Sequence, residues 1–273
     1  MNGGINNWRN PSRYNVTSDT ITLRDPVRAG YDFAGWTPAS TIPKGSTEDK
    51  TFIASWTPKT YSISYELFGG TNAPGNPSSY TIETATINLA SPTKPGYTFL
   101  GWLFSSGTIP QGSVGDRLFV AVWSLPIRYD ITYNLGGGTN AASNPSHYWV
   151  VSPKITLAAP TRAGYNFTGW TPEGIIPAGS TGPRAFTAGW EPITYAIHYE
   201  LGSGGVNATT NPATYTTEDA EITLAAPTRP GYNFIAWTPA STIPTGSTGE
   251  KTFTATWSEP IAYDIVYTLN GGT

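Results

Sequence analysis

The chain offers few side chains that could carry out acid–base, nucleophilic or metal chemistry. It has no cysteine, so thiolate nucleophiles, thiolate metal ligands and disulfides are excluded. Its two histidines, His147 and His198, fit neither a Ser–His–Asp nor an H-E-x-x-H pattern. The adjacent acids Glu48-Asp49 and Glu218-Asp219 lie in predicted loops, where we expect solvated side chains. The sequence therefore predicts no catalytic residue, no metal site, no cofactor and no enzyme.

One kind of charged residue recurs at a fixed place. Arg28, Lys94, Arg162 and Arg229 each stand two residues after a proline. A ladder of such cations could bind a polyanionic glycan of a host or of a cell wall. Alternatively, each cation stacks on a Tyr or Trp of its own repeat by a cation–π interaction. We favour stacking, because a net charge of −3 and one cation per repeat give no strong summed field.

The recurring cation belongs to a segment that the chain contains four times. The copies are Pro26–Trp36, Pro92–Trp102, Pro160–Trp170 and Pro227–Trp237, and they lie about 67 residues apart. In each copy the proline and glycine predict a turn, and the alternating Tyr and Phe predict a β-strand. The closing Trp falls out of that alternation, so we expect a β-bulge at Gly35 and at the equivalent positions. A period of this length predicts an array of small domains.

Further strands are predicted in each repeat. One has Tyr, Ile, Tyr and Leu at every second position, as in Tyr195–Leu201, and it ends at a glycine turn. Another closes the repeat with Phe, Ala and Trp at alternate positions, as in Phe186–Trp190. Between them lie a short Ile-x-Leu strand, as at Ile155–Leu157, and a turn signal that begins with Ile-Pro, as at Ile176.

These patterns set the predicted domain boundaries. Repeat 1 covers residues 1–59 and lacks the Tyr strand, repeat 2 covers 60–126, repeat 3 covers 127–193, repeat 4 covers 194–260, and residues 261–273 form the first strand of a further repeat. Two tryptophans recur in each repeat, and we predict that they are core residues, since full burial of a large side chain contributes roughly 1.5–3 kcal/mol. They are Trp36, Trp56, Trp102, Trp123, Trp170, Trp190, Trp237 and Trp257.

Composition narrows the function further. Charged residues make up 12% of the chain and aromatic residues 13%, a balance that favours short strands and tight turns over helices. The net charge of −3 offers no basic face for nucleic acid. No apolar run approaches the roughly 20 residues that cross a bilayer, and no signal peptide is recognisable, so a secreted chain would be a mature form or a fragment. Trp8 and Trp149 do not follow the repeat and are the predicted exposed contact residues.

Together the repeated blocks resemble the Listeria–Bacteroides repeat family, which includes the B-repeat of internalin B. The family pattern is Y-x-I-x-Y-x-L-x-G-G, then P-T-[RK]-x-G-Y-x-F-x-G-W, then aromatic-x-A-x-W, and all three blocks recur here in that order. Ala236 replaces a glycine of this pattern, and Leu103-Phe104 replace the usual Thr-Pro. The resemblance implies tandem β-grasp-like modules of bacterial surface or extracellular proteins, without enzymatic activity. The predicted fold class is therefore mainly β, with little helix.

The leading functional interpretation is a stalk, adhesin or fibre subunit that provides reach, and avidity through repetition. A glycan- or polyanion-binding module is the alternative. The C-terminal residues Tyr263, Ile265, Tyr267 and Leu269 form a spare strand, which could complete repeat 1 of another copy by head-to-tail strand addition. The simpler alternative is that neighbouring repeats of a longer chain supply the missing strand in cis.

Overall fold

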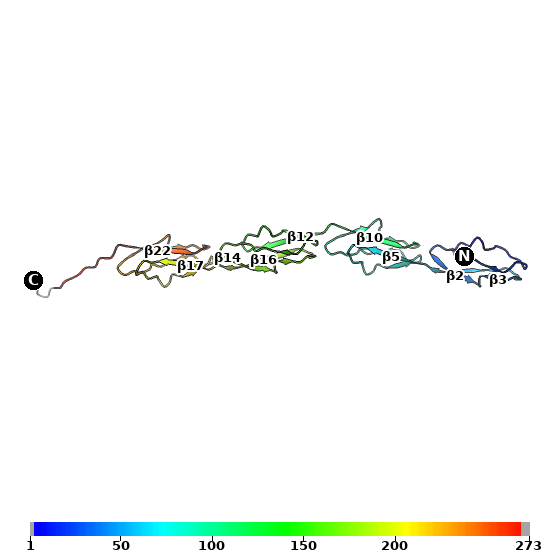
Figure 1. Cartoon of the computed structure of the whole chain (residues 1–273), viewed down its shortest axis with the longest axis horizontal. Helices are drawn as coiled ribbons and strands as arrows, with labels where there is room; N and C mark the ends of the chain where they lie inside the picture. Colours follow the sequence, from blue (N-terminus) through cyan, green and yellow to red (C-terminus); the bar gives the residue numbers. More distant parts are fainter. Residues whose placement is uncertain (1–2, 269–273) are drawn as a thin grey trace. The chain divides into compact units, whose positions relative to one another are not determined.

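The computed structural model describes residues 3–268, and the chain forms two compact units, Met1–Ile127 and Arg128–Thr273 (Figure 1). Each unit contains two of the predicted repeats. Regular secondary structure in the described part of the chain consists of β-strands. Within residues 3–268 there is no helix of the length and apolar character needed to span a bilayer.

Repeat 2 shows the architecture of a complete module. Its four-stranded sheet has the order β6-β5-β10-β8. The first and last of these strands in the sequence, β5 and β10, run parallel at the centre, and β6 and β8 lie antiparallel to them at the edges. A second, two-stranded sheet pairs β7 with β9. The bounds are β5 Thr60–Glu66, β6 Ser79–Thr81, β7 Ile87–Asn88, β8 Phe99–Trp102, β9 Thr108–Ile109 and β10 Arg117–Trp123.

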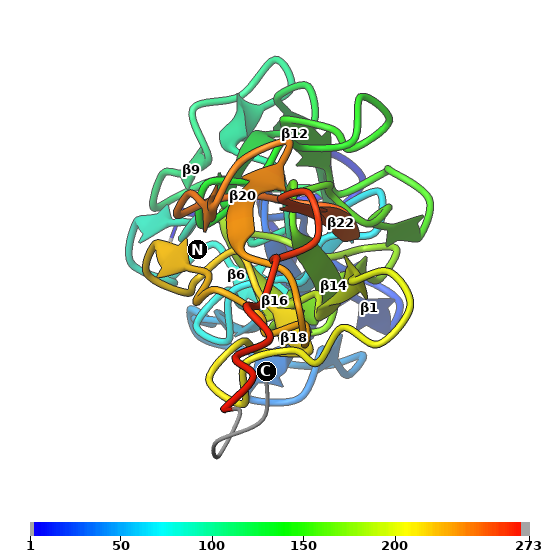
Figure 2. The same ribbon diagram turned by 90° about the vertical axis from the view of Figure 1, so that its left-hand side faces the viewer.

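Repeats 3 and 4 have the same topology in the second unit (Figures 1 and 2). The sheet orders are β12-β11-β16-β14 and β18-β17-β22-β20, again with a parallel central pair. In repeat 3 the bounds are β11 Arg128–Asn134, β12 His147–Trp149, β13 Ile155–Thr156, β14 Tyr165–Thr171, β15 Ile175–Ile176 and β16 Arg184–Pro192. In repeat 4 they are β17 Tyr195–Glu200, β18 Thr214–Tyr215, β19 Ile222–Thr223, β20 Phe234–Thr238, β21 Thr242–Ile243 and β22 Lys251–Trp257.

Repeat 1 is an incomplete version of this module. Its main sheet has two strands, β2 (Tyr31–Thr37) and β4 (Ile53–Pro58), which are antiparallel. The small sheet is present as β1 (Ile21–Thr22) paired with β3 (Thr41–Ile42). Among the described residues, β4 pairs with β2 alone, whereas β10, β16 and β22 each have a second, parallel partner. The missing Tyr strand therefore leaves one edge of β4 open.

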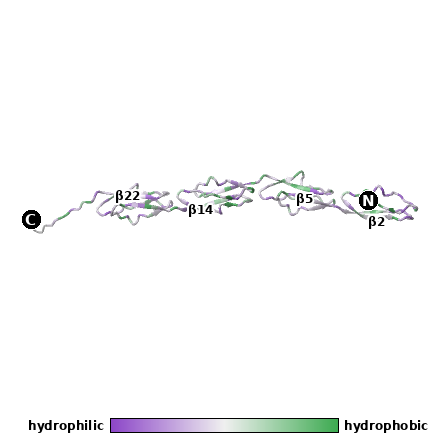
Figure 3. Cartoon of the chain, viewed as in Figure 1, coloured by the Kyte–Doolittle hydropathy of each residue, from purple (hydrophilic) through white to green (hydrophobic). Residues whose placement is uncertain are grey.

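The alternation of apolar residues explains why these segments form half-buried strands. In β11, Ile131 is buried, Tyr129 and Tyr133 are half-buried, and the residues between them are exposed. Ile131 packs in a core cluster with Tyr148 and Phe186. Equivalent residues form the core clusters of repeats 2 and 4, and Figure 3 shows hydrophobic and hydrophilic residues interspersed along the chain. The period of two predicted from the sequence is confirmed.

The predicted β-bulge is present in all four repeats. Its register shifts lie at Phe33/Gly35, Val122/Trp123, Phe167/Gly169 and Phe234/Ala236. Gly35 and Gly169 have φ angles of 140° and 136°, which L-residues rarely adopt, so glycine suits the bulge. Ala236 shows that repeat 4 forms its bulge without a glycine.

The recurring tryptophans need a correction. Trp102 and Trp237 are buried core residues, but the other six are half-buried. The reason is that the indole N–H groups need acceptors, which lie at the margin of the module. The closing tryptophans Trp123, Trp190 and Trp257 donate to the carbonyls of Leu67, Leu135 and Leu201 at 2.9, 2.8 and 2.9 Å, where the Tyr strand ends. These three residues seal the edge of the core and fasten the first strand to the last.

Candidate interaction sites

Each recurring cation stacks on the tyrosine three residues after it. The guanidinium carbons of Arg28, Arg162 and Arg229 lie 3.6, 3.5 and 3.8 Å from the ring centroids of Tyr31, Tyr165 and Tyr232. Lys94 lies 4.3 Å from the Tyr97 centroid and also donates to the carbonyl of Phe68 at 2.8 Å. The aromatic ring of its own repeat therefore occupies one face of each cation.

Within each unit, the stacked tyrosine also reaches the next repeat. The hydroxyl of Tyr31 donates to Glu83 Oε1 at 2.9 Å, and that of Tyr165 donates to Glu218 Oε1 at 3.1 Å. The result is an Arg–Tyr–Glu arrangement at the junction of repeats 1 and 2 and again at the junction of repeats 3 and 4. Glu218 was expected to be a solvated loop residue, and this contact corrects that expectation.

The charges around these tyrosines keep them as hydrogen-bond donors. The hydrogen bond to Glu83 is the main cause of a raised pKa for Tyr31. For Tyr165, desolvation comes first and the Glu218 hydrogen bond second, and both raise the pKa of the phenol. The positive charges of Arg28 and Arg162 act in the opposite direction. Both phenols consequently remain protonated at neutral pH.

Glycines permit the close approach at the same junctions. A Cβ atom on Gly30 would lie 2.6 Å from Ile82 Cδ1, and a Cβ atom on Gly164 would lie 2.9 Å from Thr217 Cβ. The carbonyls of these glycines accept hydrogen bonds from Lys59 N and Ile193 N, both at 2.9 Å, in the chain that leads to the next repeat. The junction within each unit is thus a packed and hydrogen-bonded contact.

A groove in repeat 1 marks the place of the missing strand. It has a volume of about 650 Å³ and lies between residues 11–16 on one side and residues 46–50 on the other, with Leu23, Ile42 and Phe52 also lining it. We call it the acceptor groove. Tyr14 and Phe52 are half-buried here. Their counterparts are at most 4% exposed: Tyr80, Tyr148, Tyr215, Phe119, Phe186 and Phe253.

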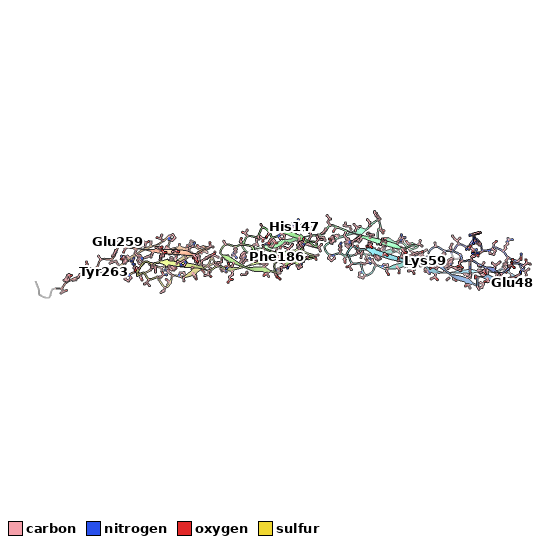
Figure 4. The ribbon with its side chains drawn as sticks, viewed as in Figure 1. Glu48, Lys59, His147, Phe186, Glu259 and Tyr263 are labelled. Atoms are coloured by element: carbon pink, nitrogen blue, oxygen red, sulfur yellow. The ribbon has the colours of Figure 1, made fainter. Side chains whose placement is uncertain are left out.

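Two polar features of repeat 1 also differ from its sister repeats. The indole N–H of Trp36 is buried without an acceptor, whereas those of Trp170 and Trp237 donate to the carbonyls of Ala158 and Ala225 at 3.2 and 3.1 Å. Glu48, labelled in Figure 4, has a φ angle of 72°, where the other repeats have glycine. Repeat 1 is therefore less well satisfied than the complete modules.

Replacing Glu48 with glycine should stabilise repeat 1. A left-handed conformation costs an L-residue about 1–2 kcal/mol, and the greater freedom of glycine in the unfolded chain offsets part of the gain. We expect a net increase of about 0.5–1 kcal/mol in the free energy of unfolding, measured by urea denaturation. Thr47→Gly is the matched control, and it should destabilise the repeat. Equal effects of the two substitutions would contradict strain at Glu48.

The non-repeating aromatic residues are exposed to different degrees. Trp8 is 84% exposed, and the guanidinium of Arg9 lies 4.8 Å from its ring. Trp149 is 38% exposed and packs edge-on against His147 at 4.7 Å. Sequence reasoning missed Phe104, which is 99% exposed with φ at 52°. The signal was present, because Leu103-Phe104 interrupt the Thr-Pro of the other repeats.

The spare C-terminal strand carries no regular pairing. Tyr263, Ile265 and Tyr267 are 74%, 75% and 79% exposed, and Tyr263 is labelled in Figure 4 beyond Glu259. In Figure 1 this segment continues past β22 without a strand arrow. Leu269, the last member of the predicted strand, lies outside the described residues.

The ionisable residues do not gather into a reactive cluster. His198 Nε2 lies 3.4 Å from Glu250 Oε2, and both side chains are more than half exposed. Asp116 accepts the backbone N–H of Ser62 at 2.7 Å, which lowers the pKa of the carboxyl group. Between residues 3 and 268, no three His, Cys, Asp or Glu side chains are grouped so as to hold a metal ion.

Repeated mixed β-modules, joined within each unit by a stacked cation–tyrosine pair, define a tandem-repeat β-protein. The profile of the Listeria-Bacteroides repeat domain matches residues 1–58, 61–110, 129–174 and 195–258, and the chain belongs to this family.

The chain is similar to several larger proteins. A putative Gly-rich membrane protein of Evansella cellulosilytica is 25% identical over 281 residues, which cover 90% of this chain and 31% of the relative. A putative membrane protein of the same organism is 24% identical over 245 residues, covering 78% and 34%. Internalin H of Listeria monocytogenes is 28% identical over 107 residues, covering 33% and 19%. The chain thus spans about a third or less of the length of these relatives.

Among solved structures, the chain is similar to SHIRT domains 3–4 from a streptococcal cell surface protein. The sequence identity is 16% and the TM-score is 0.19, and the match covers 49% of this chain and 98% of the other.

Proposed function

We propose that this chain is a non-enzymatic stalk segment of a bacterial surface or extracellular protein. The observation that carries the proposal is the junction within each unit. A stalk must limit bending between its modules, and the Tyr31–Glu83 and Tyr165–Glu218 hydrogen bonds join consecutive repeats. The closely packed Gly30 and Gly164 add apolar contact at the same places. A flexible Gly/Ser tether would have neither feature.

The relatives support a location at the bacterial surface. Internalin H contains a segment similar to this chain, and two relatives bear names of putative membrane proteins. Because this chain spans at most about a third of each, we propose that it forms the repetitive part of a larger architecture. Repetition would then supply reach for domains outside the repeats.

We further infer that each complete module is a β-grasp variant. The sheet order second, first, last, third with a parallel central pair supports this inference. In place of the helix that usually crosses such a sheet, the module has the short pairs β7–β9, β13–β15 and β19–β21. Their two-residue length fits the lack of helix-forming segments in the sequence.

The stalk proposal can be tested by distance measurements within the second unit. The chain has no cysteine, so spin labels can be placed on introduced cysteines alone. Thr168→Cys on β14 and Thr252→Cys on β22 are both exposed and lie in consecutive repeats. Double electron–electron resonance should give one narrow distance distribution. A distribution as broad as that of a flexible tether would contradict the proposal.

Glycan or polyanion binding is the second candidate, and its support is the recurrence of the cation. Since Arg162 already stacks at 3.5 Å on Tyr165, we expect only weak retention on heparin, fading within physiological salt. Arg162→Ala should leave that retention unchanged within about twofold, and Arg184→Ala, a cation outside the ladder, serves as the comparison. A selective loss of retention with Arg162→Ala, reversed by no other cation, would establish a polyanion site instead.

A further inference from the structure

The three complete modules show what belongs in the acceptor groove of repeat 1. In each of them the Tyr strand lies between an antiparallel edge strand and the parallel closing strand. The registers agree: Ile63, Ile131 and Ile197 face Arg117, Arg184 and Lys251, and Tyr65, Tyr133 and Tyr199 face Phe119, Phe186 and Phe253. The corresponding residues of repeat 1 are Lys50 and Phe52, and both line the groove. The groove therefore has the shape and register of a Tyr strand.

The C-terminal residues 261–268 have the sequence of that strand. Tyr263, Ile265 and Tyr267 stand at the places of Tyr195, Ile197 and Tyr199 of repeat 4. Their apolar side chains are exposed, and the segment has no strand pairing of its own. One chain thus holds both an unfilled strand position and an unpaired strand that fits it.

We propose that residues 261–268 of one copy insert into the acceptor groove of a second copy. The strand runs parallel to β4, with Ile265 opposite Lys50 and Tyr267 opposite Phe52. On its other side Tyr263 lies opposite Tyr14, as Tyr61, Tyr129 and Tyr195 lie opposite Tyr80, Tyr148 and Tyr215. The inference deepens the stalk proposal and rests on it, by extending a stalk segment through non-covalent joints.

Polar groups of the groove already stand where an incoming strand needs them. In the complete modules, the hydroxyls of Tyr65, Tyr133 and Tyr199 donate to the carbonyls of Pro77, Pro145 and Pro212 at 2.7, 2.7 and 2.8 Å. The corresponding carbonyl belongs to Pro11, which lines the groove, and its donor would be Tyr267. Likewise Ile63, Ile131 and Ile197 donate their backbone N–H to residues 78, 146 and 213. The corresponding acceptor is Ser12, another lining residue, and its donor would be Ile265.

Charge favours the C-terminal strand of this chain as the occupant. The cross-strand pair that precedes the two tyrosines is Ser62–Ser79 in repeat 2, Asp130–His147 in repeat 3 and Ala196–Thr214 in repeat 4. In the proposed joint it is Asp264 opposite Arg13, a pair of opposite charges. Arg13 lines the groove, and directly opposed unlike charges stabilise an antiparallel pair. Neither charge has a partner of this kind within the complete modules.

The joint is heterologous, because the donor strand follows repeat 4 and the acceptor groove lies in repeat 1. Each added copy brings a new groove and a new strand, so assembly does not end at a dimer unless a ring closes. A Tyr strand attached ahead of residue 1 would fill the same groove in cis. These two occupants make opposite predictions for the mass of the chain in solution.

The test is the molar mass of the 273-residue chain, measured by light scattering and sedimentation velocity over a range of concentrations. We expect the mass to rise with concentration and to fall to that of a monomer when residues 261–273 are deleted. A chain with residues 259–268 fused ahead of Met1 fills its own groove and should also be monomeric. A full-length chain that stays monomeric at millimolar concentration, or assembly that survives either change, would overturn the proposal.

A charge reversal tests the assigned register. Arg13→Asp and Asp264→Arg should each raise the concentration needed for assembly at least tenfold, and the chain that carries both should recover most of the loss. Asp264 lies in the unpaired segment, so its substitution leaves the folded repeats intact, and hydrogen exchange of repeats 2–4 verifies this for Arg13→Asp. A double variant no better than the single ones refutes the register. Monomers with a narrow label distance would overturn strand addition and leave the stalk proposal standing, whereas assembling chains with a broad distance would do the reverse.

Discussion

Phe186→Ala should lower the free energy of unfolding of repeat 3 by about 3–5 kcal/mol, the range for truncating a fully buried aromatic residue. Phe186 is 2% exposed, stacks on Tyr133 with a centroid distance of 6.3 Å, and meets Trp170 edge-on at 6.3 Å. Its removal would leave a cavity between the first and last strands of the module, where neighbouring rings are held by a hydrogen-bonded sheet and cannot collapse.

The matched control is Phe52→Ala, the same substitution at the same register in repeat 1. Phe52 is half-buried because no Tyr strand covers it, so we expect roughly half the loss, measured in the chain that lacks residues 261–273. Urea denaturation gives the free energies, and hydrogen exchange with mass spectrometry locates them. Loss of protection should centre on the substituted repeat, because repeats couple mainly to their neighbours. Equal losses at both sites would mean that the acceptor groove is already filled.

The strands could be predicted because burial on one face imposes a period of two on the sequence. In β17, Tyr195, Ile197 and Tyr199 alternate with exposed or partly exposed residues, and this is visible without coordinates. The partner of each strand could not be predicted in this way. The pattern states which face is buried, but it does not state that the first strand of a repeat runs parallel to the last.

The interaction sites were only partly visible in the sequence. Stacking of Arg162 on Tyr165 follows from local spacing, since the two residues are three apart in one turn. The hydrogen bond from Tyr165 to Glu218 joins residues 53 apart in consecutive repeats, and no periodic pattern indicates it. Alignment of the repeats by eye would have shown glutamate at this position in repeats 2 and 4 and Val151 in repeat 3. That irregularity was the available signal.

Gly164→Ala should disrupt the junction of repeats 3 and 4, and Gly231→Ala should not. Both glycines have a φ angle of 80°, so each substitution carries the left-handed penalty of about 1–2 kcal/mol. Only at Gly164 does the added Cβ meet a neighbour, 2.9 Å from Thr217 Cβ and Cγ2, whereas nothing lies within 4 Å of a Cβ on Gly231. Thr217 is β-branched and cannot swing aside, so overpacking adds about 1–3 kcal/mol.

The relief of that clash is a separation of the two repeats, which would also lengthen the hydrogen bond from Tyr165 to Glu218. With spin labels at Thr168→Cys and Thr252→Cys, Gly164→Ala should therefore broaden the distance distribution, and Gly231→Ala should reproduce that of the parent chain. Urea denaturation should show the larger loss of stability for Gly164→Ala. If the two variants give the same distribution, the contact between Gly164 and Thr217 does not hold the repeats together, and the stiffness that a stalk requires has to come from the proline-containing linker alone.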